Sequence, residues 1–115
     1  MYLSRDLILA VDDLATQEVD VPEWGGTVVI KMMSGKERDA FEGSLVKNKQ
    51  VTYDNIRAKL AQKTIIDPET KELMFSLGDI EAIGKKSAAA LDRVFSASQK
   101  LSKISDSDVE ELVKN

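Results

Sequence analysis

One stretch of the chain, Val19–Ile30, constrains the fold more than any other. It contains the only tryptophan, one of the two prolines and the only adjacent pair of glycines. Pro22 fixes its own φ at about −65° and disfavours helix at Val21, whereas the glycines at 25–26 allow backbone angles that other residues avoid. The β-branched run Thr27–Ile30 has the composition of a strand. The stretch therefore predicts an extended entry, a tight turn and a strand.

The residue types that are missing exclude several classes of chemistry. The 115 residues include no cysteine and no histidine. A disulfide framework, a thiolate site, the common zinc sites and Ser-His or Cys-His catalysis are therefore ruled out. A chain of this length buries roughly two thirds of its unfolded surface in one core. We expect a single domain over residues 1–115, made in a reducing compartment.

The charge pattern argues against nucleic acid and membranes as partners. Twenty acidic and 16 basic residues are spread along the chain, for a net charge of −4. We therefore predict no basic stripe that could neutralise a phosphate backbone. The apolar run Leu7–Val11 is too short to span a membrane, and it is flanked by aspartates rather than by the bases of a signal peptide. We expect a soluble protein that binds no nucleic acid and no membrane.

The first twenty residues have an ambiguous hydrophobic pattern. A five-residue apolar run fits a short strand and a helical turn equally well, and we interpret residues 1–20 as an extended segment or loop. If Leu7–Leu9 are not covered by the core, they form a candidate contact patch.

Capping signals predict the helices of the middle of the chain. Ser34 and Glu37 have the spacing of a capping box, and the helix that they begin is expected to end near 47–49. A second amphipathic helix is predicted over 55–62. Between two short apolar runs, Asp67-Pro68 has the chemistry of a turn, which predicts a hairpin of strands 64–66 and 73–75.

Three further helices are predicted towards the C-terminus. Ser76 and Asp79 cap a short helix that ends near Gly84. Apolar residues at steps of three and four predict the strongest helix over 85–101, and a last short helix follows the serine and aspartate pairs at 105–108. We therefore predict the fold class α+β: a helix-dominated single domain with a few short β-strands, including a hairpin.

No group of residues has the pattern of a catalytic, metal or cofactor site. Asp12 and Asp13 fit a solvated turn, and Asp106 and Asp108 fit a helix N-terminus better than a cation site. The glycine pair at 25–26 precedes a strand, whereas a phosphate-binding loop precedes a helix. We predict no enzyme activity and no cofactor.

The large apolar side chains allow two interpretations. We favour a core position for Trp24 over a partner contact, because a large aromatic residue buries most of its area in either case. Met32 and Met33 fit both a gap-filling core and an adaptable contact surface.

Four collinear segments carry a resemblance to a known family. They are V-P-E-W-G-G-T-V at 21–28, S-G-K-E-R-D-A-F-E at 34–42, D-P-E-T-K-E-L-M-F at 67–75 and I-G-K-K-S-A-A-A-L-D-R-V-F at 83–95, followed by D-V-E-E-L-V-K-N at 108–115. In this order they resemble the tail assembly chaperones of long-tailed, siphovirus-type, lambda-like phages. One departure is Thr70, where the family often has glycine, which implies a slightly different turn.

The resemblance implies a function without chemistry. Such a chaperone is a non-virion protein of the host bacterial cytoplasm that binds the tape-measure protein, keeps it soluble and promotes tail-tube assembly. In many members a ribosomal frameshift yields a longer form that contacts the tail-tube protein, and this chain would be the short form. Weak self-association is a further expectation.

We predict partner contacts through large apolar side chains: Trp24, Met32, Met33 and Phe41. Two other classes stay open. One is a structural virion component, such as a head–tail connector or tail-terminator subunit. The other is a small carboxylate enzyme, which would need Asp12 and Asp13 in a concave pocket.

Overall fold

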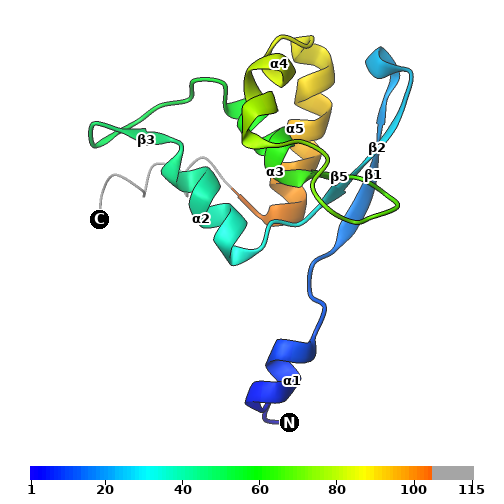
Figure 1. Ribbon diagram of the computed structural model, residues 1–115, viewed down its shortest axis with the longest axis vertical. Helices are drawn as coiled ribbons and strands as arrows, with labels where there is room; N and C mark the ends of the chain where they lie inside the picture. The colour runs from blue at the N-terminus through cyan, green and yellow to red at the C-terminus, as the bar shows by residue number, and fades with distance from the viewer. Residues whose placement is uncertain (105–115) are drawn as a thin grey trace.

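A computed structural model describes residues 1–104 and confirms the predicted α+β class, in which helices dominate and the strands are short (Figure 1). The helices are α1 (Arg5–Ala10), α2 (Gly35–Gly43), α3 (Ile56–Thr64), α4 (Ile80–Gly84) and α5 (Ala88–Ser102), with 3-10 turns η1 (Pro22–Trp24) and η2 (Leu77–Asp79). The strands are β1 (Thr16–Val21), β2 (Gly26–Lys31), β3 (Val46–Lys47), β4 (Gln50–Val51) and β5 (Ile65–Ile66).

The antiparallel β1–β2 hairpin confirms the strand and the turn predicted from Val19–Ile30. Its register pairs Val21 with Gly26 and Thr16 with Lys31, and β5 joins the free edge of β2 to give the order β1-β2-β5. Pro22 begins η1, and Gly25 closes it at φ +76°, a left-handed conformation that favours glycine. The turn residues therefore set where the chain reverses.

The core lies where α5 crosses the hairpin and packs against α3. The sheet contributes Val21 and Ile30, and α5 contributes Leu91 and Val94, all of them buried. This confirms the apolar face predicted for the strongest helix. The helix begins at Ala88 rather than at 85, because the Ser87 hydroxyl accepts a hydrogen bond from the Ala90 N–H at 3.1 Å and caps the first turn.

The α2 helix begins as predicted and ends earlier than predicted. Both bonds of the Ser34–Glu37 capping box form, at 3.1 and 2.9 Å. The helix ends at Gly43, not near 47–49, because β3 and β4 pair there as a small hairpin. Asn48 and Lys49 turn this hairpin at φ +53° and +62°. Two successive positive φ values are the geometry of a tight hairpin loop.

The hairpin predicted around Asp67-Pro68 forms only in part. Strand β5 is present, but its returning partner is reduced to a single antiparallel bridge between Ile66 and Leu73. The Asp67 carboxylate accepts bonds from two backbone N–H groups of the loop, and β5 instead pairs with β2. After the loop, the Ser76–Asp79 capping box forms as predicted.

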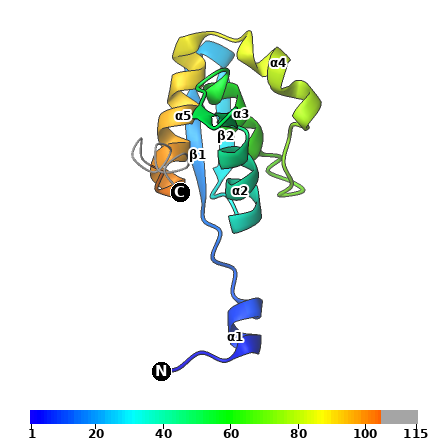
Figure 2. The ribbon, with the colours of Figure 1, turned by 90° about the vertical axis from the view of Figure 1, so that its left-hand side faces the viewer.

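The prediction of an extended segment over residues 1–20 is right for β1 and wrong for α1. The Ser4 hydroxyl accepts a bond from the Leu7 N–H at 3.2 Å and begins the short helix, a capping signal that outweighs the five-residue apolar run. Figures 1 and 2 show α1 apart from the other elements, at the end of the molecule opposite to η1.

The helix predicted after 105 lies outside the described residues. Within residues 1–104, none of the helices has both the length and the hydropathy needed to cross a membrane.

Candidate functional site

The structure divides the four predicted contact residues between the surface and the core. Trp24 is 37% exposed, so the preference for a core position was wrong. Met32 is half-buried, whereas Met33 and Phe41 are 6% and 2% exposed. Met33 and Phe41 belong to a small apolar cluster that also contains Leu45. Of the four, Trp24 therefore offers the largest accessible aromatic surface.

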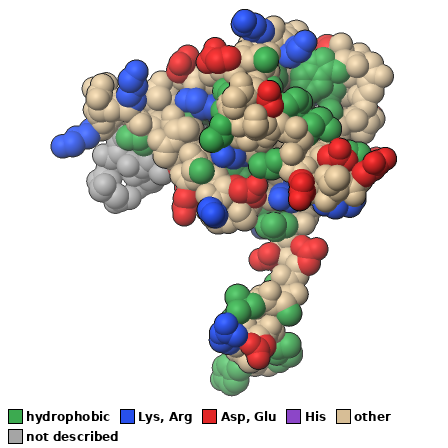
Figure 3. Space-filling model, in the orientation of Figure 1, with side chains coloured by type: hydrophobic (Ala, Val, Ile, Leu, Met, Phe, Trp, Pro, Cys, Tyr) green, Lys and Arg blue, Asp and Glu red, His purple; other side chains and the backbone are tan. Residues whose placement is uncertain are grey.

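Trp24 forms one wall of an apolar groove of about 370 Å³, which we call the Trp24 groove. The α4 helix, the η2 turn and the buried Ile65 of β5 also line this groove. Figure 3 shows hydrophobic side chains gathered beside the tip of the β1–β2 hairpin. The lining residues are Trp24, Ile65, Phe75, Asp79, Ala82, Ile83 and Lys86.

An ion pair joins η1, the turn that contains Trp24, to α5. The Arg93 Nε on α5 donates to both carboxylate oxygens of Glu23, at 2.8 and 3.2 Å. Hydrogen bonding from Arg93 lowers the pKa of Glu23 below its ordinary value, and the same contact raises the pKa of Arg93. Because Glu23 precedes Trp24, this pair connects η1 to α5 next to Trp24.

The Glu23–Arg93 pair predicts a pH-dependent contribution to stability. A carboxyl group whose pKa is lowered by folding stabilises the fold at pH above its unfolded pKa, about 4.3, and loses that contribution as the pH falls through the folded value. We expect Glu23→Gln to lower the free energy of unfolding at pH 7, and this effect to shrink as the pH falls through the lowered pKa of Glu23. Urea unfolding followed by Trp24 fluorescence measures this difference.

The matched control for this prediction is Glu18→Gln, at an exposed position of β1. An equal effect of both substitutions at pH 7, or an effect of Glu23→Gln that stays constant as the pH is lowered into the acid range, would contradict the role of the ion pair.

The α4 side of the groove is fixed by contacts to α3 and to Asn55, the residue directly before α3. The Asn55 side chain donates to the Ile80 carbonyl at 3.5 Å, and the Gln62 Nε2 donates to the Phe75 carbonyl at 3.0 Å. A Cβ on Gly84 would lie 2.3 Å from the Asn55 Oδ1, so glycine permits this close approach. The groove is thus built from elements that the core already orders.

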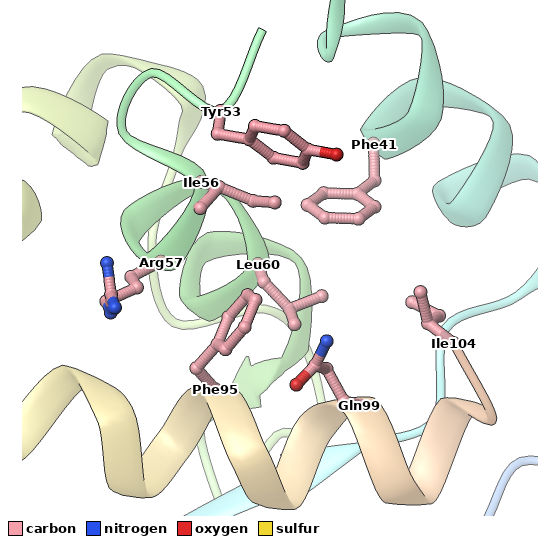
Figure 4. Close-up of a pocket in the computed structure, with 8 residues that line it drawn as sticks. All are labelled: Phe41, Tyr53, Ile56, Arg57, Leu60, Phe95, Gln99 and Ile104. Carbon is pink, nitrogen blue, oxygen red and sulfur yellow. The ribbon is translucent and has the colours of Figure 1, made fainter. Parts of the chain in front are cut away.

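A second apolar pocket of about 240 Å³ lies between α2, α3 and α5 (Figure 4). Phe41 forms one wall and Phe95 the facing one, while Tyr53 at the rim is 51% exposed. Arg57 forms an ion pair with Asp92 and lies 6.0 Å from the centre of the Phe95 ring. Although Phe41 is buried, its ring faces this pocket.

The carboxylates considered for catalysis do not form a site. Asp12 and Asp13 are exposed in the segment between α1 and β1, and the Asp12 carboxylate accepts a bond from the Leu14 N–H at 3.3 Å. This is the solvated turn that we favoured for them, and it removes the concave pocket on which the enzyme hypothesis depended. Asp106 and Asp108 lie outside the described residues. Residues 1–104 contain no cluster of three or more acidic side chains suited to a metal ion.

The contact patch proposed for Leu7–Leu9 is exposed, with Leu7, Ile8 and Leu9 at 49%, 55% and 67%.

The sequence gives no sign of the Trp24 groove, because its walls come from segments up to 62 positions apart, Trp24 and Lys86. The burial of alternate strand residues and the Ser76–Asp79 capping box indicate the separate strands and helices. They do not indicate which of these elements lie side by side.

A solved phage tail assembly chaperone has a fold similar to this arrangement of a three-stranded antiparallel sheet and crossing helices. The solved structure of the bacteriophage HK97 tail assembly chaperone is similar over 89% of this chain and 95% of that chain, with a TM-score of 0.63 and 22% sequence identity. Neither the protein-family models nor the curated proteins that were compared match this sequence. The likeness establishes the fold.

Proposed function

We propose that this chain is a phage tail assembly chaperone, which binds the tape-measure protein, keeps it soluble and promotes tail-tube assembly in the host bacterial cytoplasm. The observation that carries the proposal is the fold shared with the HK97 chaperone over nearly the whole of both chains. The sequence resemblance supports it independently, because it was found in segments spread from 21 to 115. A surface with apolar grooves also fits a protein that binds its partner and catalyses no reaction.

The Trp24 groove is the surface that we propose for the tape-measure protein. An amphipathic helix binds by placing its apolar face in such a groove, and tryptophan is enriched among the residues that dominate binding energy. The half-buried Met32 adds a flexible apolar contact on the edge of β2. Phe41, with Met33 behind it, would contribute through the second pocket. We further propose that a longer, frameshifted form contacts the tail-tube protein.

Co-expression with the tape-measure protein tests this function. We expect most of the tape-measure protein to move from the insoluble to the soluble fraction and to co-purify with this chain. The measurement is the ratio of the two proteins after affinity purification, with an unrelated acidic protein of equal size as the control. A tape-measure protein that stays insoluble would contradict the proposal, as would abundant copies of this chain in mature particles.

A further inference from the structure

The second apolar pocket, which we call the Phe41 pocket, lies beside Ile104, the last residue that the structure describes. Ile104 lines this pocket together with Phe41 and Phe95 (Figure 4). It is half-buried and packs against the apolar cluster that contains Phe41 and Leu60. The chain therefore passes into residues 105–115 at the edge of an apolar pocket.

The end of α5 bends the chain toward this pocket. Lys103 has a left-handed φ of +55°, and its N–H donates to the Lys100 carbonyl at 3.3 Å. The N–H of Ile104 donates to the Gln99 carbonyl at 3.0 Å. These two bonds form the Schellman motif, which ends a helix and turns the chain away from its axis. The turn places Ile104 on the cluster around Phe41.

The sequence after this turn has an apolar edge that fits such a pocket. Val109, Leu112 and Val113 have the spacing of one face of a helix. A helix as short as the one predicted here is marginal in water unless it packs against a surface. Val109 follows Ile104 by five positions, and a chain can extend by about 3.3–3.6 Å per residue, which is enough to reach across the pocket.

Charge complementarity favours the same occupant. Residues 105–115 contain one base, Lys114, and four acids: Asp106, Asp108, Glu110 and Glu111. The β3–β4 hairpin carries two exposed bases, Lys47 and Lys49. The hairpin lies beside the pocket, because Val51 of β4 packs against the same cluster as Ile104. Opposite charges would therefore orient the acidic segment over the pocket.

We propose that residues 105–115 dock in the Phe41 pocket of their own chain, with the apolar edge in the pocket and the acids toward the β3–β4 hairpin. The segment then acts as a cover, and any partner that binds in this pocket must first displace it. The contact does not depend on the proposed function, but tape-measure contacts made through Phe41 would compete with it.

The reactivity of introduced thiols tests this contact, because the chain has no cysteine of its own. Val113→Cys places a thiol on the apolar edge, and Lys114→Cys places one on the opposite side of the predicted helix. The rate of reaction with a maleimide is divided by the rate for the same variant unfolded in urea, which removes intrinsic differences between the thiols. We expect Val113→Cys to react at least about tenfold more slowly than Lys114→Cys, since a docked thiol reacts only when the segment opens.

A second substitution locates the docking site. Tyr53 is 51% exposed at the rim of the pocket, so Tyr53→Asp adds an acid there without disturbing the core. Combined with Val113→Cys, it should remove most of the protection. The matched control is Tyr2→Asp, the same change at an exposed tyrosine that does not line the pocket, and it should leave the protection unchanged. Circular dichroism verifies that each variant is folded.

Three results would overturn the proposal. Equal normalised rates for the two thiols would show that the apolar edge is not docked. Protection that survives Tyr53→Asp in a folded chain would place the segment on another surface, and protection that grows with protein concentration would place it on a second copy. The purified chain is tested alone, so each of these results leaves the chaperone proposal standing, and co-expression with the tape-measure protein tests that proposal separately.

Discussion

Replacing Phe41 with alanine is expected to lower the free energy of unfolding by about 3–5 kcal/mol. The side chain is 2% exposed and packs in a cluster with Met33, Leu45 and Leu60, so its removal leaves a cavity that the neighbouring helices can fill only in part. A loss of this size is comparable with the whole stability of many small domains. Urea unfolding followed by circular dichroism measures the change.

Two variants show whether the effect comes from the cavity. Phe41→Leu keeps most of the volume and should cost less than about 1.5 kcal/mol. Tyr53→Ala removes an aromatic ring from the exposed rim of the same pocket and should change stability little. If Phe41→Ala costs less than about 1 kcal/mol, Phe41 is not the core residue that its burial indicates.

Local chemistry explains why the sequence predicted several elements correctly. The Ser34–Glu37 and Ser76–Asp79 capping boxes are each complete within four residues, and the turn at Gly25 needs only the glycine itself. The strand at Thr27–Ile30 follows from β-branched residues next to that turn. Signals of this kind depend on neighbours in the chain, which a sequence shows directly.

Features that depend on distant contacts could not be predicted in this way. The end of α2 is set by the small β3–β4 hairpin, whose turn residues Asn48 and Lys49 resemble an ordinary polar loop. The returning segment near Leu73 forms one bridge on one edge of β5, whereas β2 pairs with the other edge. In both cases the outcome depends on pairing between segments rather than on local propensity alone.

The position of Trp24 was the site feature that sequence reasoning could not settle. The Glu23–Arg93 ion pair beside it joins residues 70 positions apart and connects η1 to α5. The groove beside it likewise depends on where α4 lies, and this is fixed by the close approach of Gly84 to Asn55. Neither contact leaves a signal in the local pattern of residues.

Replacing Trp24 with alanine is expected to weaken binding of the tape-measure protein at least about 30-fold. Truncation of a residue that dominates an interface costs about 2 kcal/mol or more, and each 1.4 kcal/mol corresponds to a factor of ten in affinity. Since the indole is 37% exposed and lies at the hairpin tip, the cost in stability should be smaller than that of Phe41→Ala. The measurement is the binding of a soluble tape-measure fragment to the purified, folded variant.

The controls compare two exposed aromatic residues that line different pockets. Trp24→Phe keeps an aromatic wall and should recover most of the affinity, whereas Tyr53→Ala removes an exposed ring from the other pocket and should leave binding through the Trp24 groove unchanged. Full binding by folded Trp24→Ala would exclude the Trp24 groove as the contact surface. If Tyr53→Ala instead lost binding, the tape-measure protein would occupy the pocket walled by Phe41.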